Sequence, residues 1–373
     1  MIPNCRFYCP TEIVFGRGKL QELNNKLESL GVKRVFFLFD SALSSIASLI
    51  EASTNVTLVS HELQNGEPSL DLLSVTAEVA CASGCDGVVA LGGGSVIDIG
   101  KVIAVTAAGV YHNYRAYLGE GGSSVRSVLP LVAIPTTAGT GAEVTRGVAV
   151  VDDKTGAKIG FAKGGCHPRL AILDPSLTDL LPPTQTSVSG LDAFCQALEA
   201  YISPRAFPTT DCFSLQALRW VNEHFALAIA GGNPRSRDAM MIAATFSALS
   251  FSTGSGLTFS HHFSDLAGPQ LGIPHGYAAS LLIPGVVEQA YQARPERFDP
   301  LAQALGVSSH ELVFSKISQV LAQSAAPSIS SIITLSEALE LAEASLDLVD
   351  DRAPFSREEA LEAVMLSFQR TAA

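Results

Sequence analysis

The chain has 373 residues, of which 47% are hydrophobic and 16% charged, with a formal net charge of −12 at pH 7. This composition excludes a disordered chain, and the length allows two domains with sizeable cores. An acidic surface gains no counterion release from a polyanion, so we expect neither nucleic acid nor a membrane surface as a partner.

The sequence also argues against a membrane-spanning or secreted protein. Gly, Ser, Pro or a charge interrupts every apolar stretch before the ~20 residues that a spanning helix needs. The first residues, MIPNCRFYCPTEIVFG, lack the basic end and apolar middle of a signal peptide. The seven cysteines are odd in number and form no C-x-x-C pair. We therefore expect a cytoplasmic protein with reduced, structural thiols.

Through about Leu180 the chain alternates short apolar runs with helical periodicity, as parallel strand–helix units do. Runs such as VFFLF and VVAL are apolar throughout, which is typical of strands buried on both faces. Residues 1–182 are therefore predicted to form an open α/β domain. Its strands are expected at Arg34–Phe39, Val56–Val59, Gly87–Leu91, Leu129–Ile134, Gly147–Val151 and Lys158–Phe161.

After Leu181-Pro182-Pro183 the sequence changes to long Ala/Leu-rich segments with charges on one side. Residues 183–373 are therefore predicted to be all-helical. The helices are expected at Ser187–Tyr201, Thr209–Ile229, Arg235–Ser252, Val286–Ala293, Ser308–Ala322, Thr334–Asp347 and Glu358–Ala372. A glycine-rich and serine-rich patch at Gly119–Ser127 is typical of a mobile surface loop.

A glycine triplet, Gly92-Gly93-Gly94, followed by Ser95, comes directly after a predicted buried strand and opens a predicted helix through Lys101. Glycines let the backbone approach a ligand, and the first N–H groups of a helix attract an anion such as a pyrophosphate. The pattern is not G-x-G-x-x-G, so a simple tight turn is an equal alternative.

Two further segments follow predicted strands at the same edge of the sheet. Asp40 follows the strand Arg34–Phe39, where a carboxylate can accept hydrogen bonds from a ribose and would repel a 2′-phosphate. The alternative is that Asp40 only caps a helix. The segment Pro135–Thr145 carries more hydroxyls and glycines than a turn requires. From the residues alone, a ligand site at this edge and a set of ordinary turns and caps both stay open.

Polar residues also gather in the helical half. Three of the eight histidines, His261, His262 and His275, fall within fifteen residues, and this clustering favours a site. Asp192 lies in an apolar helical stretch, where an unpaired carboxylate would be costly to bury, so it needs a partner such as a metal ion. Gln196 follows one helical turn later, and Glu199 has the spacing of the next turn.

In order and spacing, these segments resemble the iron-containing (group III) alcohol dehydrogenase family, relatives of dehydroquinate synthase and glycerol dehydrogenase. The resemblance runs from Phe15-Gly16-Arg17-Gly18 to Leu282-Ile283-Pro284 and includes Glu67-Pro68-Ser69, Leu173-Asp174-Pro175 and Gly190–Ser203. It implies a dehydroquinate synthase-like fold, an α/β nucleotide-binding domain joined to an all-α domain, with cofactor and substrate in the cleft between them. It also implies a homodimer or larger homo-oligomer acting on a small-molecule substrate.

The resemblance assigns roles in cofactor binding. Asp40 resembles the residue that reads the adenosine ribose, which favours NAD(H) over NADP(H). Gly93, Gly94 and Ser95 resemble the pyrophosphate cradle. The residues that resemble those around the ribose and nicotinamide are Asp98, Thr136, Thr137, Thr140, Thr145 and Lys158.

The family's divalent metal, Fe²⁺ or Zn²⁺, is bound by one Asp and three His, of which Asp192, His261 and His275 match three. Gln196 stands where the first His is usual, and Asp265 stands where many members have another active-site His. An amide oxygen is a weaker donor than imidazole for these metals. Either Gln196 completes a weakened site, or no metal binds and His261, His262 and His275 polarise the substrate oxygen themselves.

The function that the resemblance implies is an NAD(P)-dependent alcohol dehydrogenase or aldehyde reductase. The alternatives are a dehydroquinate synthase-like cyclase or lyase, and a degenerate nucleotide-binding protein without catalysis. A cyclase needs several basic groups for a phosphorylated sugar, and the candidates are few: Arg146, Lys158, Lys163 and Arg169. Arg146 follows Thr145 directly and could accept the carboxylate, phosphate or phosphonate of an anionic aldehyde, although a plain surface arginine is the alternative.

Overall fold

The computed structural model describes residues 5–64, 66, 68–109, 128–154, 156–162, 166–231, 233–348 and 353–371. The predicted loop at Gly119–Ser127, and the candidates Glu67 and Lys163, lie outside these residues. The chain forms two compact units. An α/β unit comprises Cys9–Thr137 and Gly141–Leu180, and a helical unit comprises Leu181–Ala373 with the N-terminal segment through Tyr8 and the short segment Ala138–Thr140.

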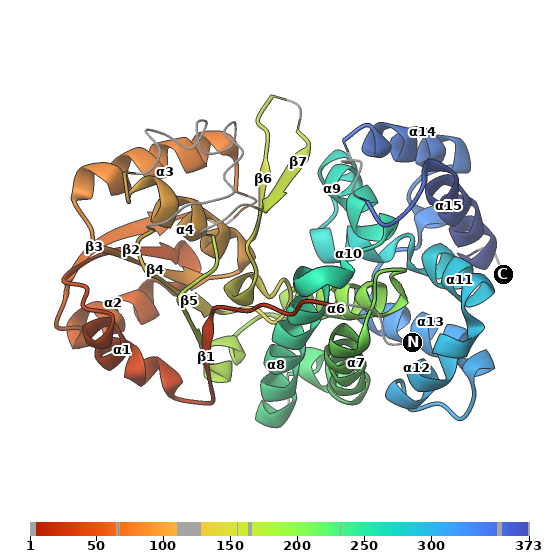
Figure 1. Cartoon of the computed structure of the whole chain (residues 1–373), viewed down its shortest axis with the longest axis horizontal. Coiled ribbons are helices and arrows are strands. Elements are labelled where there is room, and N and C mark those ends of the chain that lie inside the picture. The colour runs from red at the N-terminus through yellow and green to blue at the C-terminus, as the bar shows by residue number, and fades with distance from the viewer. Residues whose placement is uncertain are drawn as a thin grey trace. The chain divides into compact units, whose positions relative to one another are not determined.

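The α/β unit is built on a parallel sheet with the strand order β1-β8-β5-β4-β2-β3 (Figure 1). This confirms the predicted α/β class. Its strands are β1 Glu12–Phe15, β2 Arg34–Asp40, β3 Thr57–Leu63, β4 Gly87–Gly92, β5 Leu131–Pro135 and β8 Leu170–Leu173. The edge strand β1 and the short strand β8 were not predicted. The predicted extended pair forms an antiparallel ribbon of β6 Gly147–Val151 and β7 Lys158–Ala162.

Helices cover both faces of the sheet, which explains the unbroken apolar runs in its strands. Along β2, Phe36 and Leu38 face one core, which includes α3 (Leu70–Ser83) and α4 (Gly94–Thr106). Phe37 and Phe39 face the opposite core, with α1 (Leu23–Ser29) and α2 (Ser44–Ser53). Figure 1 shows the two pairs of helices on opposite sides of the strands.

The strand order reverses between β2 and β4. From β2 the chain moves outward to β3, whereas from β4 it moves the other way to β5 and then β8. Phe39 of β2 lies in register with Leu91 of β4, so these two strands end side by side. Ligands of open parallel sheets bind at the carboxyl ends of the strands where the order reverses. Asp40 is the last residue of β2, and Gly93 directly follows β4.

The helical unit surrounds α6, which is buried along most of its length and packs against α7, α8 and α10. The predicted all-α class is confirmed. Its helices are α6 Pro183–Ile202, α7 Pro208–Ile229, α8 Pro234–Ser250, α9 Phe259–Leu271, α10 His275–Ser280, α11 Ile283–Ala293, α12 Phe298–Ala304, α13 Val313–Ser324, α14 Leu335–Leu346 and α15 Arg357–Thr371. The helices α9, α10 and α12 were not predicted; α9 carries Gly268 and Pro269 inside it, and the other two are short.

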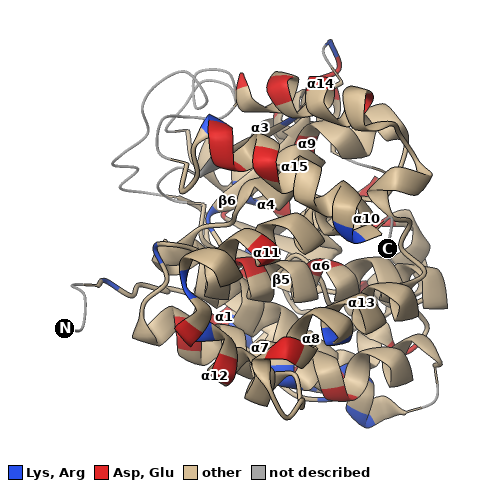
Figure 2. Ribbon diagram, turned by 90° about the vertical axis from the view of Figure 1, so that its right-hand side faces the viewer, with Lys and Arg blue, Asp and Glu red and all other residues tan. Residues whose placement is uncertain are grey.

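Acidic side chains recur on the surface of the helical unit, in keeping with the net charge of −12. Glutamate residues recur along α14 and α15, whose ribbons carry red segments in Figure 2. Among the described residues, no helix combines the length and the apolar character needed to cross a membrane.

Candidate active site and metal centre

The glycine turn after β4 presents the start of α4. Gly93 is the N-cap in an extended conformation, and the first helical hydrogen bond runs from the Ile97 N–H to the Gly93 carbonyl at 3.2 Å. The N–H groups of Gly94, Ser95 and Val96 therefore precede the first helical bond, and they are the donors that a bound anion can use. The turn is also tied to the next strand, because the Thr136 N–H donates to the Gly92 carbonyl at 3.0 Å.

Asp40 ends β2 beside this turn. Its Oδ1 accepts a hydrogen bond from the Ala42 N–H at 2.8 Å, so the capping alternative is realised by that oxygen. Among the described residues, Oδ2 has no hydrogen-bond partner, which leaves it available to a second donor. Asp40 can therefore cap the helix with Oδ1 and still accept a hydrogen bond from a ribose hydroxyl with Oδ2.

A buried lysine connects the candidate nucleotide residues. Lys101 is fully buried on α4 and donates to Asp98 Oδ1 at 2.9 Å, Thr145 Oγ1 at 3.2 Å and the Gly147 carbonyl at 2.6 Å. The other carboxylate oxygen, Asp98 Oδ2, accepts from the Ala149 N–H at 2.9 Å. Asp98 and Lys101 therefore join α4 to the start of β6 and fix the position of Thr145. This structural role of Asp98 and Lys101 was not foreseen.

The other predicted nucleotide residues are divided between the two units. Thr136 and Thr137 follow β5 in the α/β unit, and Lys158 is the first residue of β7. Thr140 belongs instead to the short segment grouped with the helical unit. In that segment, a side chain at Gly139 would meet Ser189 at 2.9 Å, so this position requires a glycine.

Arg146 lies near a partly buried histidine, His167. Arg146 is exposed at the start of β6. Burial, with the positive charges of Lys101 and Arg146, lowers the pKa of His167 to about 4. His167 was not singled out from the sequence, because only the fold brings it near these two cations.

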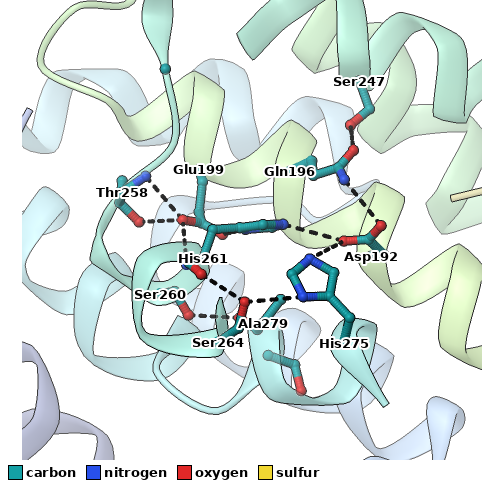
Figure 3. A network of polar contacts seen from close by, with 12 residues as sticks. Asp192, Gln196, Glu199, Ser247, Thr258, Ser260, His261, Ser264, His275 and Ala279 are labelled. Carbon is teal, nitrogen blue, oxygen red and sulfur yellow. Dashed lines mark hydrogen bonds and ion pairs between the residues drawn. The ribbon is translucent and has the colours of Figure 1, made fainter. Parts of the chain in front are cut away.

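In the helical unit, Asp192, His261 and His275 come together from α6, α9 and α10 (Figure 3). Asp192 Oδ1 lies 3.2 Å from His261 Nε2 and 3.9 Å from His275 Nε2, and one ligand atom from each residue lies within 4.8 Å of the others. Gly276 permits this approach, since a Cβ there would lie 2.1 Å from the Val188 carbonyl oxygen of α6.

Further contacts orient both imidazoles. His261 Nδ1 is hydrogen-bonded to Glu199, a fully buried carboxylate that also accepts from the Thr258 N–H at 2.9 Å. The Ser264 hydroxyl donates to the His261 carbonyl at 2.6 Å, so its oxygen accepts from His275 Nδ1 at 3.3 Å. Both Nε2 atoms therefore face Asp192, the arrangement usual around metal-binding histidines. The sequence did not predict that Thr258 would bind Glu199 or that Ser264 would orient His275.

Gln196 lies beside Asp192, as the helical spacing predicts, but its amide nitrogen faces the carboxylate. Gln196 Nε2 donates to Asp192 Oδ2 at 3.0 Å, and Gln196 Oε1 accepts from the Ser247 hydroxyl of α8 at 3.2 Å. All three side chains are buried.

The electrostatics of this group fit a divalent cation. Burial disfavours the charged form of His261, but Glu199 and Asp192 outweigh burial and raise its pKa to about 10. Two buried carboxylates with one imidazolium leave one net negative charge, which a divalent cation in place of the imidazolium proton would cancel. In addition, His275 Nε2 lies 3.9 Å from Asp192 Oδ1, beyond hydrogen-bond distance. Imidazole nitrogen and carboxylate oxygen suit Fe²⁺ or Zn²⁺.

Two predicted active-site residues are not part of this group. The His262 ring packs edge-on against Phe355, with ring centroids 5.1 Å apart, and its backbone carbonyl accepts from Ser345 at 2.9 Å. Asp265 lies one turn after His261 on α9 and is partly exposed.

Comparison with known proteins places both halves of the chain in one family. The family described as iron-containing alcohol dehydrogenase matches residues 10–175, and the C-terminal model of the same family matches residues 186–344. The probable alcohol dehydrogenase EutG of Salmonella typhimurium is 32% identical over 80% of this chain and 76% of its own. A sulfoacetaldehyde reductase of Bilophila wadsworthia is 33% identical over 80% of this chain and 78% of its own.

A similar solved structure is that of sulfoacetaldehyde reductase from Bifidobacterium kashiwanohense in complex with NAD⁺. It has a TM-score of 0.90 and 25% identity, with both chains covered completely. These matches confirm the resemblance that the motifs carry, and with it an oxidoreductase acting on CH–OH groups. The chain belongs to the iron-containing alcohol dehydrogenase family.

Proposed function

We propose that this oxidoreductase uses NAD(H) to interconvert a small aldehyde and its alcohol. Hydride passes between C4 of the nicotinamide and the carbonyl carbon, and the charge that develops on the oxygen must be stabilised. The observation that carries the proposal is the convergence of Asp192, His261 and His275 beside the buried carboxylate of Glu199. Oxidation of NADH by short aldehydes, with the metal content measured on the same sample, tests it.

Asp192, His261 and His275 would hold the divalent metal, which when bound supplies Lewis-acid polarisation of the substrate oxygen. Glu199 keeps Nδ1 of His261 hydrogen-bonded, so that Nε2 stays directed at Asp192. Ser264 orients His275 in the same way. Asp265, partly exposed one turn after His261, is our candidate for moving a proton to solvent.

A cyclase or lyase function is less well supported. The basic groups that it would need are sparse, and the charge of Lys101 is already balanced by Asp98. The relatives are named as alcohol dehydrogenases and reductases. If the chain binds NADH but turns over no aldehyde, a degenerate nucleotide-binding function replaces our proposal.

We expect the cofactor to be NAD(H), because the carboxylate of Asp40 would stand against the 2′-phosphate of NADP(H). Asp40→Gly should raise the ratio of kcat/KM for NADPH to that for NADH about 10-fold, the gain from removing roughly 1.4 kcal/mol of repulsion. Asp40→Asn is the matched control, since Asn caps a helix as well as Asp does but carries no charge. Asp40→Asn should raise the NADPH-to-NADH ratio of kcat/KM by the same factor and leave the stability of the protein unchanged. A wild type that already prefers NADPH would show that Asp40 does not lie at the ribose.

We also propose an anionic aldehyde as the substrate. Two relatives are named as reductases of sulfoacetaldehyde, whose sulfonate is an anion. Arg146 follows Thr145 directly and is an exposed cation in a chain of net charge −12. These features support Arg146 as the group that binds the anion.

Arg146→Gln should raise KM for an anionic aldehyde about 10-fold or more. The reason is that one lost hydrogen bond to a charged group costs about 1.5–3 kcal/mol. KM for a neutral aldehyde of similar size should not change. Arg169→Gln, which alters another exposed arginine of the same unit, is the control. Equal effects on both aldehydes would argue against an anion site at Arg146.

A further inference from the structure

The two oxygens of Asp192 face different partners. Oδ1 faces Nε2 of His261 and Nε2 of His275, whereas Oδ2 accepts from the Gln196 amide at 3.0 Å (Figure 3). Asp192 and Gln196 stand one turn apart on α6, and both are buried. Only Oδ1 is therefore directed at the position where the two imidazoles converge.

The orientation of the Gln196 amide follows from the chemistry of its neighbours. An ionised carboxylate only accepts hydrogen bonds, so the side of the amide that faces Asp192 must be the NH₂ group. The oxygen then points the other way, where the fully buried Ser247 hydroxyl donates to it at 3.2 Å. Turning the amide over would place two oxygens against each other in a buried site, which is unfavourable.

We propose that Gln196 is a positioning residue and not a fourth metal ligand. Ser247 holds the amide oxygen away from Asp192, and the amide nitrogen, by donating to Oδ2, orients the carboxylate so that Oδ1 faces the two imidazoles. The protein then supplies three ligand atoms: Asp192 Oδ1, His261 Nε2 and His275 Nε2. This inference rests on the metal site of the proposed function and specifies which side chains bind directly.

The proposal explains why Gln is acceptable where the family usually has His. Histidine at this position would add an imidazole to the shell, whereas Gln196 acts only through Asp192. Residues that orient a ligand typically change metal affinity about 10-fold to 100-fold without themselves binding the metal. Gln196 and Ser247 should therefore act on affinity together, through one carboxylate.

Titration of the chelator-treated full-length protein with Co²⁺ tests this, without NADH or aldehyde. The visible absorption of bound Co²⁺ reports the ligand set, and competition with a chromophoric chelator gives the affinity. Gln196→Leu should weaken Co²⁺ binding about 10-fold and leave the absorption spectrum unchanged. Ser247→Ala should weaken it less, with the same spectrum. The double variant should equal Gln196→Leu alone, because Ser247 acts through Gln196.

Three results would overturn the proposal: a changed Co²⁺ spectrum in either single variant, additive losses in the double variant, or no Co²⁺ binding by the wild type. Circular dichroism of the metal-free proteins checks that each variant folds, and Ser247→Ala keeps the test decisive if Gln196→Leu does not fold. Since the titration contains no substrate, its outcome is separate from that of the aldehyde assay. Absence of NADH oxidation by a protein that binds Co²⁺ as expected would reject the proposed function alone.

Discussion

Replacement of Gly93 by Val is expected to abolish NADH binding while leaving the fold intact. A branched side chain at the N-cap of α4 would occupy the place of the pyrophosphate and keep it from the first N–H groups of the helix. Loss of two hydrogen bonds to a charged group, each about 1.5–3 kcal/mol, raises the Kd by about 100-fold or more.

The fold should tolerate this change because Gly93 is extended, with φ −73° and ψ −174°, which any residue adopts. A Cβ there would make only ordinary contact with the Thr137 side chain at 3.5 Å. Gly92 would be a poor choice, since its Cβ would meet Val96 at 2.6 Å.

Titration of NADH fluorescence gives the Kd, and thermal unfolding followed by circular dichroism gives the stability. Ala52→Val is the control, because it also introduces a valine but places it on the exposed surface of α2. It should leave the Kd for NADH unchanged. If Gly93→Val bound NADH as tightly as the wild type, the turn after β4 would have no part in phosphate binding.

The strands that the sequence predicts best are those with both faces covered. In β2 and β4 every central residue is buried, so the apolar run is continuous and easily seen. The edge strand β1 has four residues, none of them fully buried, and its pattern resembles a loop. Its partner β8 is buried but equally short, so no long apolar run marks it. Short strands are defined by their neighbours in the sheet, which local sequence does not reveal.

In the candidate site, too, some residues could be recognised from the sequence, whereas their contacts depend on the fold. Asp192 and the histidines stand out because a carboxylate in an apolar helix and a cluster of imidazoles are unusual. The helical spacing also placed Gln196 correctly beside Asp192. Its orientation could not be predicted, because it depends on Ser247, which lies 51 residues away on another helix. The pairing of Glu199 with His261 spans 62 residues and likewise needs the fold.

Gln196→His is expected to tighten metal binding. The substitution places an imidazole one helical turn from Asp192, on the buried side of α6 where His261 and His275 also converge. A nitrogen donor suits Fe²⁺ and Zn²⁺ better than an amide, and here it would add a ligand where the wild type has an orienting group. The gain is opposed by loss of the hydrogen bond to Asp192 Oδ2, so we expect a net rise in affinity of about 10-fold or more.

Competition with a chromophoric chelator gives the Zn²⁺ affinity, and elemental analysis gives the metal retained after dialysis. Gln292→His adds a histidine on the exposed surface of α11 and controls for non-specific binding. The Co²⁺ spectrum should change in Gln196→His but not in Gln196→Leu, because only the imidazole enters the shell. Activity is a separate measurement, since the added imidazole changes the metal site but not Asp265, our candidate for moving the proton. Two metal-free proteins would contradict the expectation, because they would show that Asp192, His261 and His275 do not hold a metal even with an imidazole added at position 196.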